Sequence, residues 1–225
     1  MQLVLTGLGA LIMVAICALS LSFIIAEQRR GHGAEAAPKD RIGVRDISSR
    51  QVDPKPLSLG EVFPGPEIRL VSGAEPYRIA MTHIDTDCNI ATTGTLGGLL
   101  DDDGCTQVVR AGMTAPYGGY LVTAGVFNLT DADRAKRAGD QVGTQVENGA
   151  GGFAAMTTGL PGADATQPLS QLGWRDRGHF LIYCVVTRPD GQVVRDDDPY
   201  ARRISADLVE SYLSETVVGK RTLNP

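Results

Sequence analysis

The stretch over residues 105–129 constrains the fold more than any other part of this sequence. In its first half, apolar residues expected on one face of a strand alternate with residues expected on the other face, among them Arg110. A similar alternation resumes over residues 120–127. Residues 116–119 (PYGG) separate the two halves. Period-two runs on either side of a Pro/Gly turn are typical of a β-hairpin. Because helical patterns flank this hairpin on both sides, we expect it to lie in the middle of an α+β sheet.

Residues before the hairpin predict a strand and a helix. Residues 77–84 (YRIAMTHI) alternate as a first strand, and Thr86 or Asp87 can cap a helix over residues 88–101. The glycines at positions 94, 97 and 98 each cost that helix about 1 kcal/mol relative to alanine. The segment is therefore either packed closely on the sheet or broken.

Residues after the hairpin predict a second helix, two strands and a third helix. The helix starts at residues 130–133 (TDAD), which resemble a capping box, and ends near Glu147. A strand at 153–157 and a loop at 158–173 follow, and then residues 179–187 (HFLIYCVVT) are apolar on both faces, as in a doubly covered strand. Asp198 caps the last helix, with Pro199 at its first position.

This order predicts the fold class. The first six elements run β-α-β-β-α-β, which matches a ferredoxin-like split β-α-β sandwich. A further strand and a C-terminal helix are added to it, and the inner stripe of that helix is Ile204, Leu208 and Tyr212. We therefore expect an α+β globular domain over residues 57–225, joined to what precedes it by a linker over residues 27–56 that is rich in charged and small residues and in proline.

Residues 3–26 (LVLTGLGALIMVAICALSLSFIIA) carry no charge. At about 1.5 Å per residue they reach roughly 36 Å, enough to cross a hydrocarbon core of about 30 Å. A cleaved signal peptide has a basic leader and a shorter apolar core, so we predict one uncleaved transmembrane helix within residues 1–26, in contact with membrane lipid. Arg29 and Arg30 follow it, and the positive-inside rule taken alone places the rest of the chain in the cytoplasm.

Cysteine spacing limits the cross-links. Cys17 lies in the apolar stretch, which leaves Cys88, Cys105 and Cys184 for at most one disulfide and one free thiol. An unbroken helix between Cys88 and Cys105 would hold its ends roughly 20 Å apart, whereas a disulfide needs Cα atoms within about 7 Å. Either the glycines break the helix and allow that bridge, or Cys184 is a partner, or all three stay reduced.

Candidate chemical sites are weak. His179 with Trp174, Arg175 and Asp176 could form an acid–base pair in a cleft, but no nucleophile motif accompanies it. The aspartate runs at 101–103 and 196–198 lack the spacing of a calcium loop. The cysteine and histidine spacings fit no zinc site, and the glycine-rich segment at 149–152 matches no nucleotide-binding motif. We therefore expect no catalytic residue, metal or cofactor.

Charge excludes one class of partner. The formal net charge of the chain is −5, and the sequence contains no cluster of basic residues, so we expect no nucleic acid partner.

Several stretches resemble one group of proteins. DCNIATTGTLGGLLDDDGC, QVVRA, YLVTAGVFNL, GHFLIYCVV and DDPYARRISADLVESYL are similar to sequences of uncharacterised actinobacterial membrane proteins. The resemblance covers residues 57–215. It implies one membrane-spanning helix in the cell membrane followed by a globular domain outside the cytoplasm, and it implies no activity.

Together these observations favour a non-catalytic, membrane-anchored binding or sensor-like domain. Its partner would be a protein, a cell-wall component or a small ligand. The alternatives are a membrane-tethered hydrolase that uses His179 and an accessory subunit of a larger membrane complex. Three titratable groups in one deep pocket would favour the hydrolase, and a flat exposed apolar patch would favour the subunit.

Overall fold

The computed structural model describes residues 44–156 and 170–223. The strands of the main sheet are β1 (Glu67–Ile68), β2 (Tyr77–Asp85), β4 (Gln107–Thr114), β5 (Leu121–Asn128), β7 (Gln171–Arg177) and β8 (Phe180–Thr187). A second, two-stranded sheet pairs β3 (Thr92–Gly94) with β6 (Gly151–Phe153). The helices are α2 (Leu59–Val62), the 3₁₀ turn η1 (Cys88–Ala91), α3 (Leu96–Asp102), α4 (Ala132–Glu147), α5 (Pro199–Ser205), the π-helix η3 (Ala206–Val218) and α6 (Gly219–Leu223).

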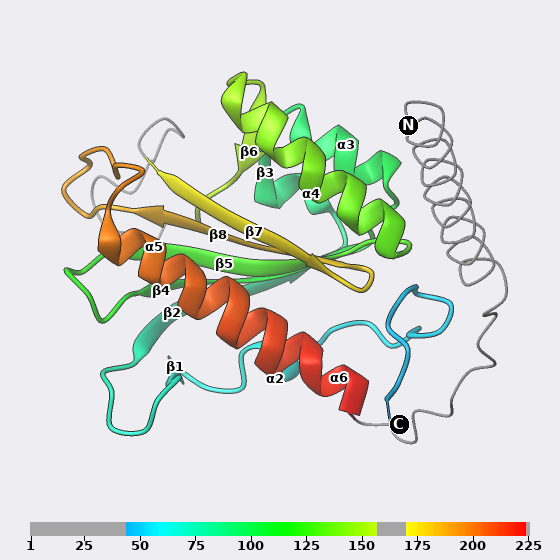
Figure 1. Ribbon diagram of the computed structural model, residues 1–225, viewed down its shortest axis with the longest axis horizontal. Helices are drawn as coiled ribbons and strands as arrows, with labels where there is room; N and C mark the ends of the chain where they lie inside the picture. The colour runs from blue at the N-terminus through cyan, green and yellow to red at the C-terminus, as the bar shows by residue number, and fades with distance from the viewer. Residues whose placement is uncertain (1–43, 157–169, 224–225) are drawn as a thin grey trace, which may run out of the picture. The chain divides into compact units, whose positions relative to one another are not determined.

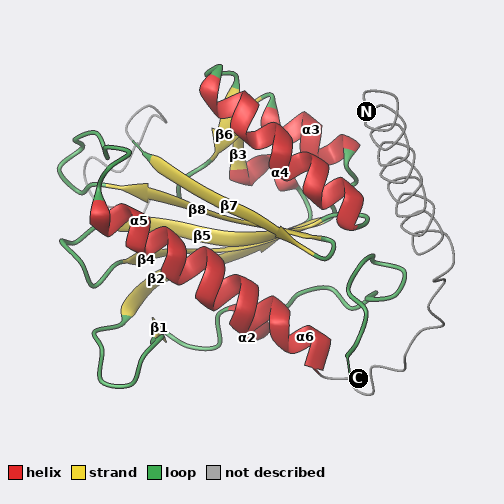
Figure 2. Cartoon of the chain, in the orientation of Figure 1, coloured by secondary structure: helices red, strands yellow, loops and turns green. Residues whose placement is uncertain are grey.

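The main sheet lies between two helical layers. Its strand order is β1-β2-β4-β5-β8-β7, and all neighbours are antiparallel. The continuous helix formed by α5, η3 and α6 covers one face, and α4 with α3 and the small sheet covers the other (Figures 1 and 2). The mixed α+β class expected from the sequence is confirmed.

The predicted hairpin is confirmed as β4 and β5, in the centre of the sheet. Thr114 pairs with Leu121, and Gly118 and Gly119 in the connecting turn have φ of +54° and +69°, values that suit glycine. Alternate residues of the hairpin enter two separate apolar cores. One core lies under the C-terminal helix and the other under α4.

The strand predicted at 179–187 is confirmed as β8, and its two faces are both buried. Ile182 and Cys184 face the C-terminal helix, while Leu181 and Tyr183 face the α4 layer. Its hairpin partner β7 was not predicted, because residues up to 173 were expected to form a loop. The turn between them needs Gly178, whose φ is +55° and where a Cβ atom would lie 2.3 Å from a backbone oxygen of the N-terminal segment.

The ferredoxin-like arrangement is not confirmed. In a split β-α-β unit the two strands that flank a helix run parallel, with another strand between them. Here β2 and β4 flank α3 but are hydrogen-bonded antiparallel neighbours. The segment between them leaves the main sheet and returns to it, so β1, β2, β4 and β5 follow one another as a meander. After β5 the chain passes through α4 to the edge strand β7 and returns as β8 between the two.

The helix predicted over residues 88–101 is broken. It consists of η1, the short strand β3 and α3, and Gly94 at the break has φ of +60°. The fold-back brings the Cα atoms of Cys88 and Cys105 to 6.3 Å, and a disulfide joins them. Cys184 is free and buried in β8. Of the pairings left open by the sequence, the structure has the one that required a broken helix.

The two remaining predicted helices start within one residue of the expected positions. Asp131, and not Thr130 of the predicted capping box, caps α4, where its side chain accepts a hydrogen bond from the backbone N–H of Arg134. Asp198 caps α5 by accepting from the N–H groups of Tyr200 and Ala201, with Pro199 at the first position. Downstream, Ile204 and Leu208 are fully buried on the inner stripe. The widened π-helical turns of η3 were not predicted.

The linker predicted over residues 27–56 is wrong for its described part. Residues 44–56 fold onto the domain, where Ile47 is buried and Ser49 forms a bridge with Asp131. The side chain of Arg50 donates to the carbonyl oxygen of Gly104 at 2.8 Å. The domain therefore begins at least a dozen residues before Leu57.

The predicted membrane span at residues 3–26 lies outside the described residues. Among the helices of residues 44–156 and 170–223, none has the length and apolar character that crossing a bilayer requires.

Candidate functional site

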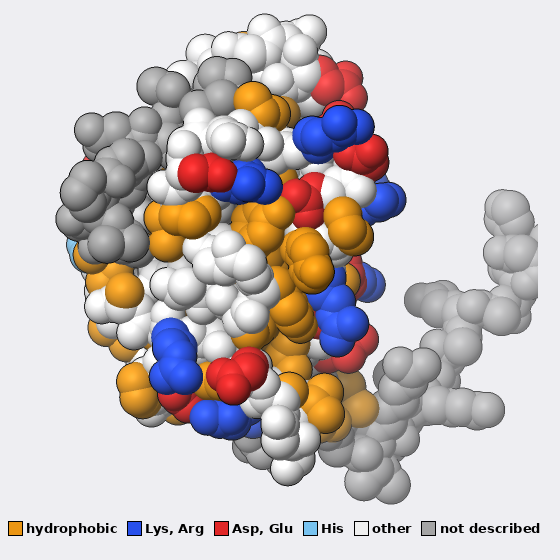
Figure 3. All heavy atoms as spheres, turned by 90° about the vertical axis from the view of Figure 1, so that its left-hand side faces the viewer, with side chains coloured by type: hydrophobic (Ala, Val, Ile, Leu, Met, Phe, Trp, Pro, Cys, Tyr) orange, Lys and Arg blue, Asp and Glu red, His pale blue; other side chains and the backbone are white. Residues whose placement is uncertain are grey.

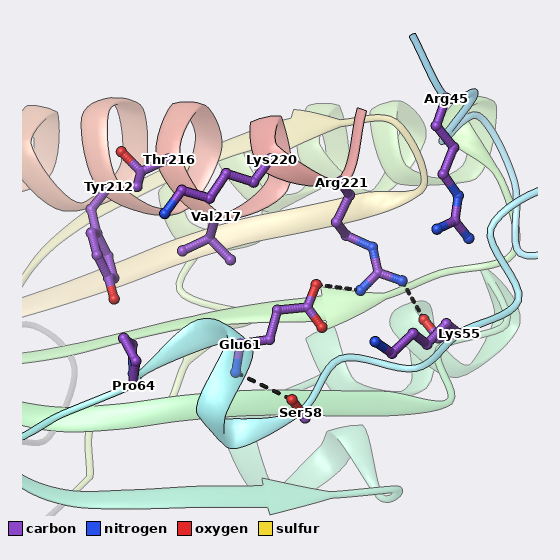
Figure 4. Close-up of a pocket in the computed structure, with 10 residues that line it drawn as sticks. All are labelled: Arg45, Lys55, Ser58, Glu61, Pro64, Tyr212, Thr216, Val217, Lys220 and Arg221. Atoms are coloured by element: carbon purple, nitrogen blue, oxygen red, sulfur yellow. Dashed lines mark hydrogen bonds and ion pairs between the residues drawn. The ribbon is translucent and has the colours of Figure 1, made fainter. Parts of the chain in front are cut away.

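A hollow of about 400 Å³ lies between α2 and the last turns of the C-terminal helix, and we name it the α2–α6 pocket. It is bounded on one side by residues 45–64 and on the other by η3 and α6 (Figure 4). Its lining residues are Arg45, Lys55, Ser58, Glu61, Pro64, Tyr212, Thr216, Val217, Lys220 and Arg221.

Capping and tertiary hydrogen bonds fix the α2 wall. Ser58 caps α2, and its Oγ accepts a hydrogen bond from the N–H of Glu61 at 3.2 Å. The hydroxyl of Tyr212, a lining residue in η3, donates to the carbonyl oxygen of Val62 at 2.7 Å. The two walls are thus tied together, and the pocket is preformed in the described structure.

Arg221 forms the floor of the pocket. It is 6% exposed, and it donates through Nε and Nη2 to the two carboxylate oxygens of Asp53 at 2.8 and 2.9 Å. Its Nη1 donates to Glu61 at 2.6 Å, and Nη2 also contacts the carbonyl oxygen of Lys55 (Figure 4). A guanidinium with this many acceptors has little capacity left for a ligand, so Arg221 positions the walls.

The carboxylate of Asp53 accepts hydrogen bonds or ion pairs from several side chains in this part of the domain. It is 1% exposed, and besides Arg221 it pairs with Arg45 at 2.7 Å and lies 3.3 Å from Nε2 of His179. Burial alone would raise the pKa of Asp53, but the hydrogen bonds and charge of Arg221, with help from His179 and Arg45, lower it. Asp53 is therefore an anion at neutral pH.

His179 is part of this buried network and does not contact the residues that the sequence associated with it. It is 0% exposed, and its Nδ1 lies 3.0 Å from Oδ1 of Asn128 and 3.2 Å from the carbonyl oxygen of Leu129. With Nε2 facing Asp53, both ring nitrogens are occupied. A buried imidazole with no free nitrogen is poorly placed to act on a substrate.

The three residues that the sequence associated with His179 lie on β7 and serve other contacts. Trp174 donates from Nε1 to the carbonyl oxygen of Gly139 at 2.9 Å, and Arg175 forms an ion pair with Glu210. Asp176 is an exposed residue of the same strand. The proposed acid–base cluster is therefore not assembled, because side chains that precede a tight turn do not converge on the residue within it.

The aspartate runs are also used by the fold. Asp103 is 2% exposed and pairs with Arg137 of α4, and Asp101 accepts a hydrogen bond from Asn89 at 2.8 Å. Asp197 pairs with Arg195 at 2.9 Å, beside the helix cap Asp198. Within the described ranges, no group of three or more histidine, cysteine, aspartate or glutamate residues is placed to hold a metal ion.

Two lysines give the α2–α6 pocket an excess of positive charge. Lys55 and Lys220 are exposed, extend toward the pocket from its two walls, and form no ion pair with any residue of the described chain (Figure 4). Together with Arg45 and Arg221 they supply four positive charges, against the two carboxylates of Asp53 and Glu61. The excess of cations makes the pocket suitable for an anion.

This pocket was not predicted from the sequence. Asp53 and Arg221 are 168 residues apart, and Asp53 was assigned to a linker. The one local signal is the pair Lys220 and Arg221 at the end of the C-terminal helix, where basic residues are common for reasons of helix stability alone.

A cluster of tyrosines lies at the other end of the C-terminal helix. The Tyr117 and Tyr200 rings stack at 6.1 Å, and the hydroxyls of Tyr77 and Tyr117 both donate to Oδ2 of Asp207, at 2.8 and 3.0 Å. Figure 3 shows hydrophobic side chains gathered between charged ones at this end of the domain. Because the hydroxyls are used internally, we assign the cluster to the packing of α5 on the β4–β5 turn.

Comparison with known proteins adds no relative: no family model, no curated protein and no solved structure matches the chain.

We expect the domain to lose stability as the pH falls below about 6.5, the ordinary pKa of an unfolded histidine. Burial lowers the pKa of His179 in the folded state, so the unfolded chain binds the proton first and folding is disfavoured. Asp53, whose pKa is also lowered, adds a further loss below about pH 4. Unfolding midpoints measured across this pH range check the expectation.

His179→Gln should flatten the part of this profile near pH 6. His83→Gln is the matched control, because the His83 side chain is 43% exposed. A His179→Gln variant with the same pH profile as the parent would contradict the assignment.

Proposed function

We propose that this chain is a membrane-anchored, non-catalytic binding protein whose globular domain holds a small anionic ligand in the α2–α6 pocket. The observation that carries the proposal is the pair of exposed lysines, Lys55 and Lys220, which lie on opposite walls without carboxylate partners in the described chain. Ammonium groups that are not neutralised internally remain able to bind an external anion.

The pocket supports binding rather than hydrolysis. The only histidine near it, within the described ranges, is His179, which is completely buried behind Asp53. Ser58 lines the pocket, but its Oγ accepts a hydrogen bond from the backbone N–H of Glu61, and the nearby Glu61 carboxylate is paired with Arg221. The donors available to a ligand are therefore the two lysines, the remaining N–H groups of Arg45 and the hydroxyl of Ser58.

We further propose that the chain crosses the cell membrane once, through residues 3–26, with the binding domain outside the cytoplasm. The absence of charge in that stretch and the resemblance to actinobacterial membrane proteins support this topology. The Cys88–Cys105 disulfide supports it independently, because such bonds persist mainly in oxidising compartments.

Replacement of both lysines tests the ligand site. The double variant Lys55→Gln/Lys220→Gln should bind inorganic phosphate or citrate at least about tenfold more weakly than the parent, because two charge-assisted hydrogen bonds are lost. Isothermal titration calorimetry of the full chain in detergent measures the affinity. Both side chains are exposed, so the unfolding midpoint should hardly change.

Lys136→Gln is the matched control, because Lys136 is an exposed lysine of α4 that already pairs with Asp140. It should leave the affinity unchanged. Equal binding by the double variant and this control, or no saturable binding of either anion by the parent, would contradict an anion site in the pocket.

A further inference from the structure

The α2–α6 pocket has two ends of different chemical character. Arg45 and Lys55 lie at one end (Figure 4). The lining residues of the opposite end come from the loop after α2 and from η3, and they are Pro64, Tyr212, Thr216 and Val217. We name these four residues the apolar end of the pocket, because the two hydroxyl groups among them are already used by the fold.

Both hydroxyls of the apolar end donate to backbone carbonyl oxygens. The Tyr212 hydroxyl donates to Val62 at 2.7 Å, and Oγ1 of Thr216 donates to Ser211 at 2.9 Å. Burial raises the pKa of Tyr212 to about 12, so its phenol stays neutral and keeps the proton that it donates. With both protons engaged, Tyr212 presents its ring to the pocket and Thr216 its methyl group.

The apolar end is held in place by the core beneath it. Val217 is 5% exposed and belongs to the core under the C-terminal helix. The Phe63 ring lies behind Tyr212, with 6.4 Å between the ring centroids. A fixed apolar surface that faces an open pocket gains free energy when a ligand removes it from water. Phosphate, which has no apolar surface, would leave it hydrated.

Lys220 joins the apolar end to the positive charge of the pocket. It lies one turn after Val217, and its side chain extends back along the helix toward Tyr212 (Figure 4). It is exposed and forms no ion pair with a carboxylate of the described chain. An ammonium group that borders apolar surface suits a ligand whose negative group is attached to an apolar body.

The remaining charges and the volume of the pocket limit the ligand further. The Glu61 carboxylate, paired with Arg221, lies between the two ends and opposes a second negative charge on the ligand (Figure 4). The pocket volume of about 400 Å³ is within the range of small-molecule sites and leaves space for more than a carboxylate group. These features favour a monoanion with a compact apolar body.

We infer that the ligand of the α2–α6 pocket is a monocarboxylate that carries an aromatic or similar apolar ring. Its carboxylate pairs with Lys220, and its ring lies against Tyr212 and Val217. The inference rests on the anion site proposed above and adds the chemical class of the ligand. The charge pair fixes the orientation of the ligand, while burial of the ring contributes affinity in proportion to its apolar area.

Isothermal titration calorimetry of the parent full chain in detergent, with the detergent solution alone as blank, tests the ligand class. Benzoate and acetate carry the same charge at neutral pH and differ in the ring. Benzoate should bind at least about tenfold more tightly than acetate. Benzyl alcohol, which has the ring without the charge, should bind at least about tenfold more weakly than benzoate. Inorganic phosphate should displace benzoate.

Two sets of variants locate the ring and the carboxylate. Val217→Thr keeps the shape of the side chain but adds a hydroxyl to the ring surface, and should weaken benzoate about threefold to tenfold without changing the affinity for phosphate. Val209→Thr is the matched control, because Val209 is a buried valine of η3 outside the pocket lining. Lys220→Gln should weaken benzoate about tenfold or more, and Lys55→Gln should weaken it less.

The outcomes separate this inference from the proposed anion site. Equal affinities of the parent for benzoate and acetate, with phosphate still bound, would overturn the inference alone, and this comparison depends on no variant. So would benzoate that phosphate does not displace, equal losses of benzoate and phosphate in Val217→Thr, or an equal loss of benzoate in Val209→Thr. No saturable binding of phosphate, citrate or benzoate would overturn the inference and the anion site together.

Discussion

Asp53→Ala should lower the free energy of unfolding by about 3–5 kcal/mol, the cost of removing one partner of a buried ion pair. Arg221, which is 6% exposed, would lose two hydrogen bonds, and Arg45 and His179 would lose their shared acceptor. Chemical unfolding followed by the fluorescence of Trp174, the single tryptophan of the chain, measures the change.

Asp197→Ala is the control for this experiment. Asp197 also pairs with an arginine, Arg195, but its side chain is 67% exposed, and exposed pairs contribute at most about 1 kcal/mol. If the two variants unfolded at the same denaturant concentration, the network around Asp53 would not be the element that joins residues 44–56 to the domain.

Replacement of both cysteines of the bridge, Cys88→Ala/Cys105→Ala, should cost about 3 kcal/mol on the chain-entropy model for a loop of this length. The cysteines are 17 residues apart, and the bond closes the segment that contains η1, β3 and α3. The thermal unfolding midpoint of the parent should fall in the presence of a reductant, and that of the double variant should not respond.

Cys184→Ala separates the bridge from the free thiol. Because Cys184 takes no part in the disulfide, this variant should keep the full response to reductant. A parent protein whose midpoint is insensitive to reductant would contradict the bridge, and it would remove one support for a domain outside the cytoplasm.

The sequence predicts those parts of the fold in which a local pattern agrees with the tertiary environment. The central hairpin has a period of two and a turn with glycines, and both of its faces are buried. The α4 helix starts at the cap Asp131 and ends at Glu147, where Asn148 and Gly149 stop it. In these elements, capping, periodicity and burial all favour the same structure.

Other parts of the fold depend on contacts that no local pattern contains. β7 carries Gly173 and three charged residues because it is an edge strand, and this composition resembles a loop. The break near Gly94 was indicated only as an alternative, since glycine weakens a helix without specifying what replaces it. The order of the strands, with β8 between β5 and β7, is likewise a property of the whole sheet.

The candidate sites were the least predictable part. The α2–α6 pocket joins residues near position 55 to residues near position 220, and each half alone has the composition of an ordinary surface. In β4, the alternation placed Arg110 on the face opposite Val109, as observed. The bulge in β2 leaves no mark in the sequence, because the alternation is offset by one residue only.

The way in which residues 44–56 attach to the domain determines its response to a pulling force. The N–H of Arg45 donates to the carbonyl oxygen of Thr222 at 2.8 Å, and Ser49 and Arg50 bind the segment that leads into α4. Tension applied to the chain before residue 44 therefore loads these peripheral hydrogen bonds one after another, before any strand of the main sheet bears it. Detachment of this segment would separate Asp53 from Arg221 and remove one wall of the α2–α6 pocket while the sheet stayed folded. We therefore expect the pocket to be lost at a lower force than the sheet.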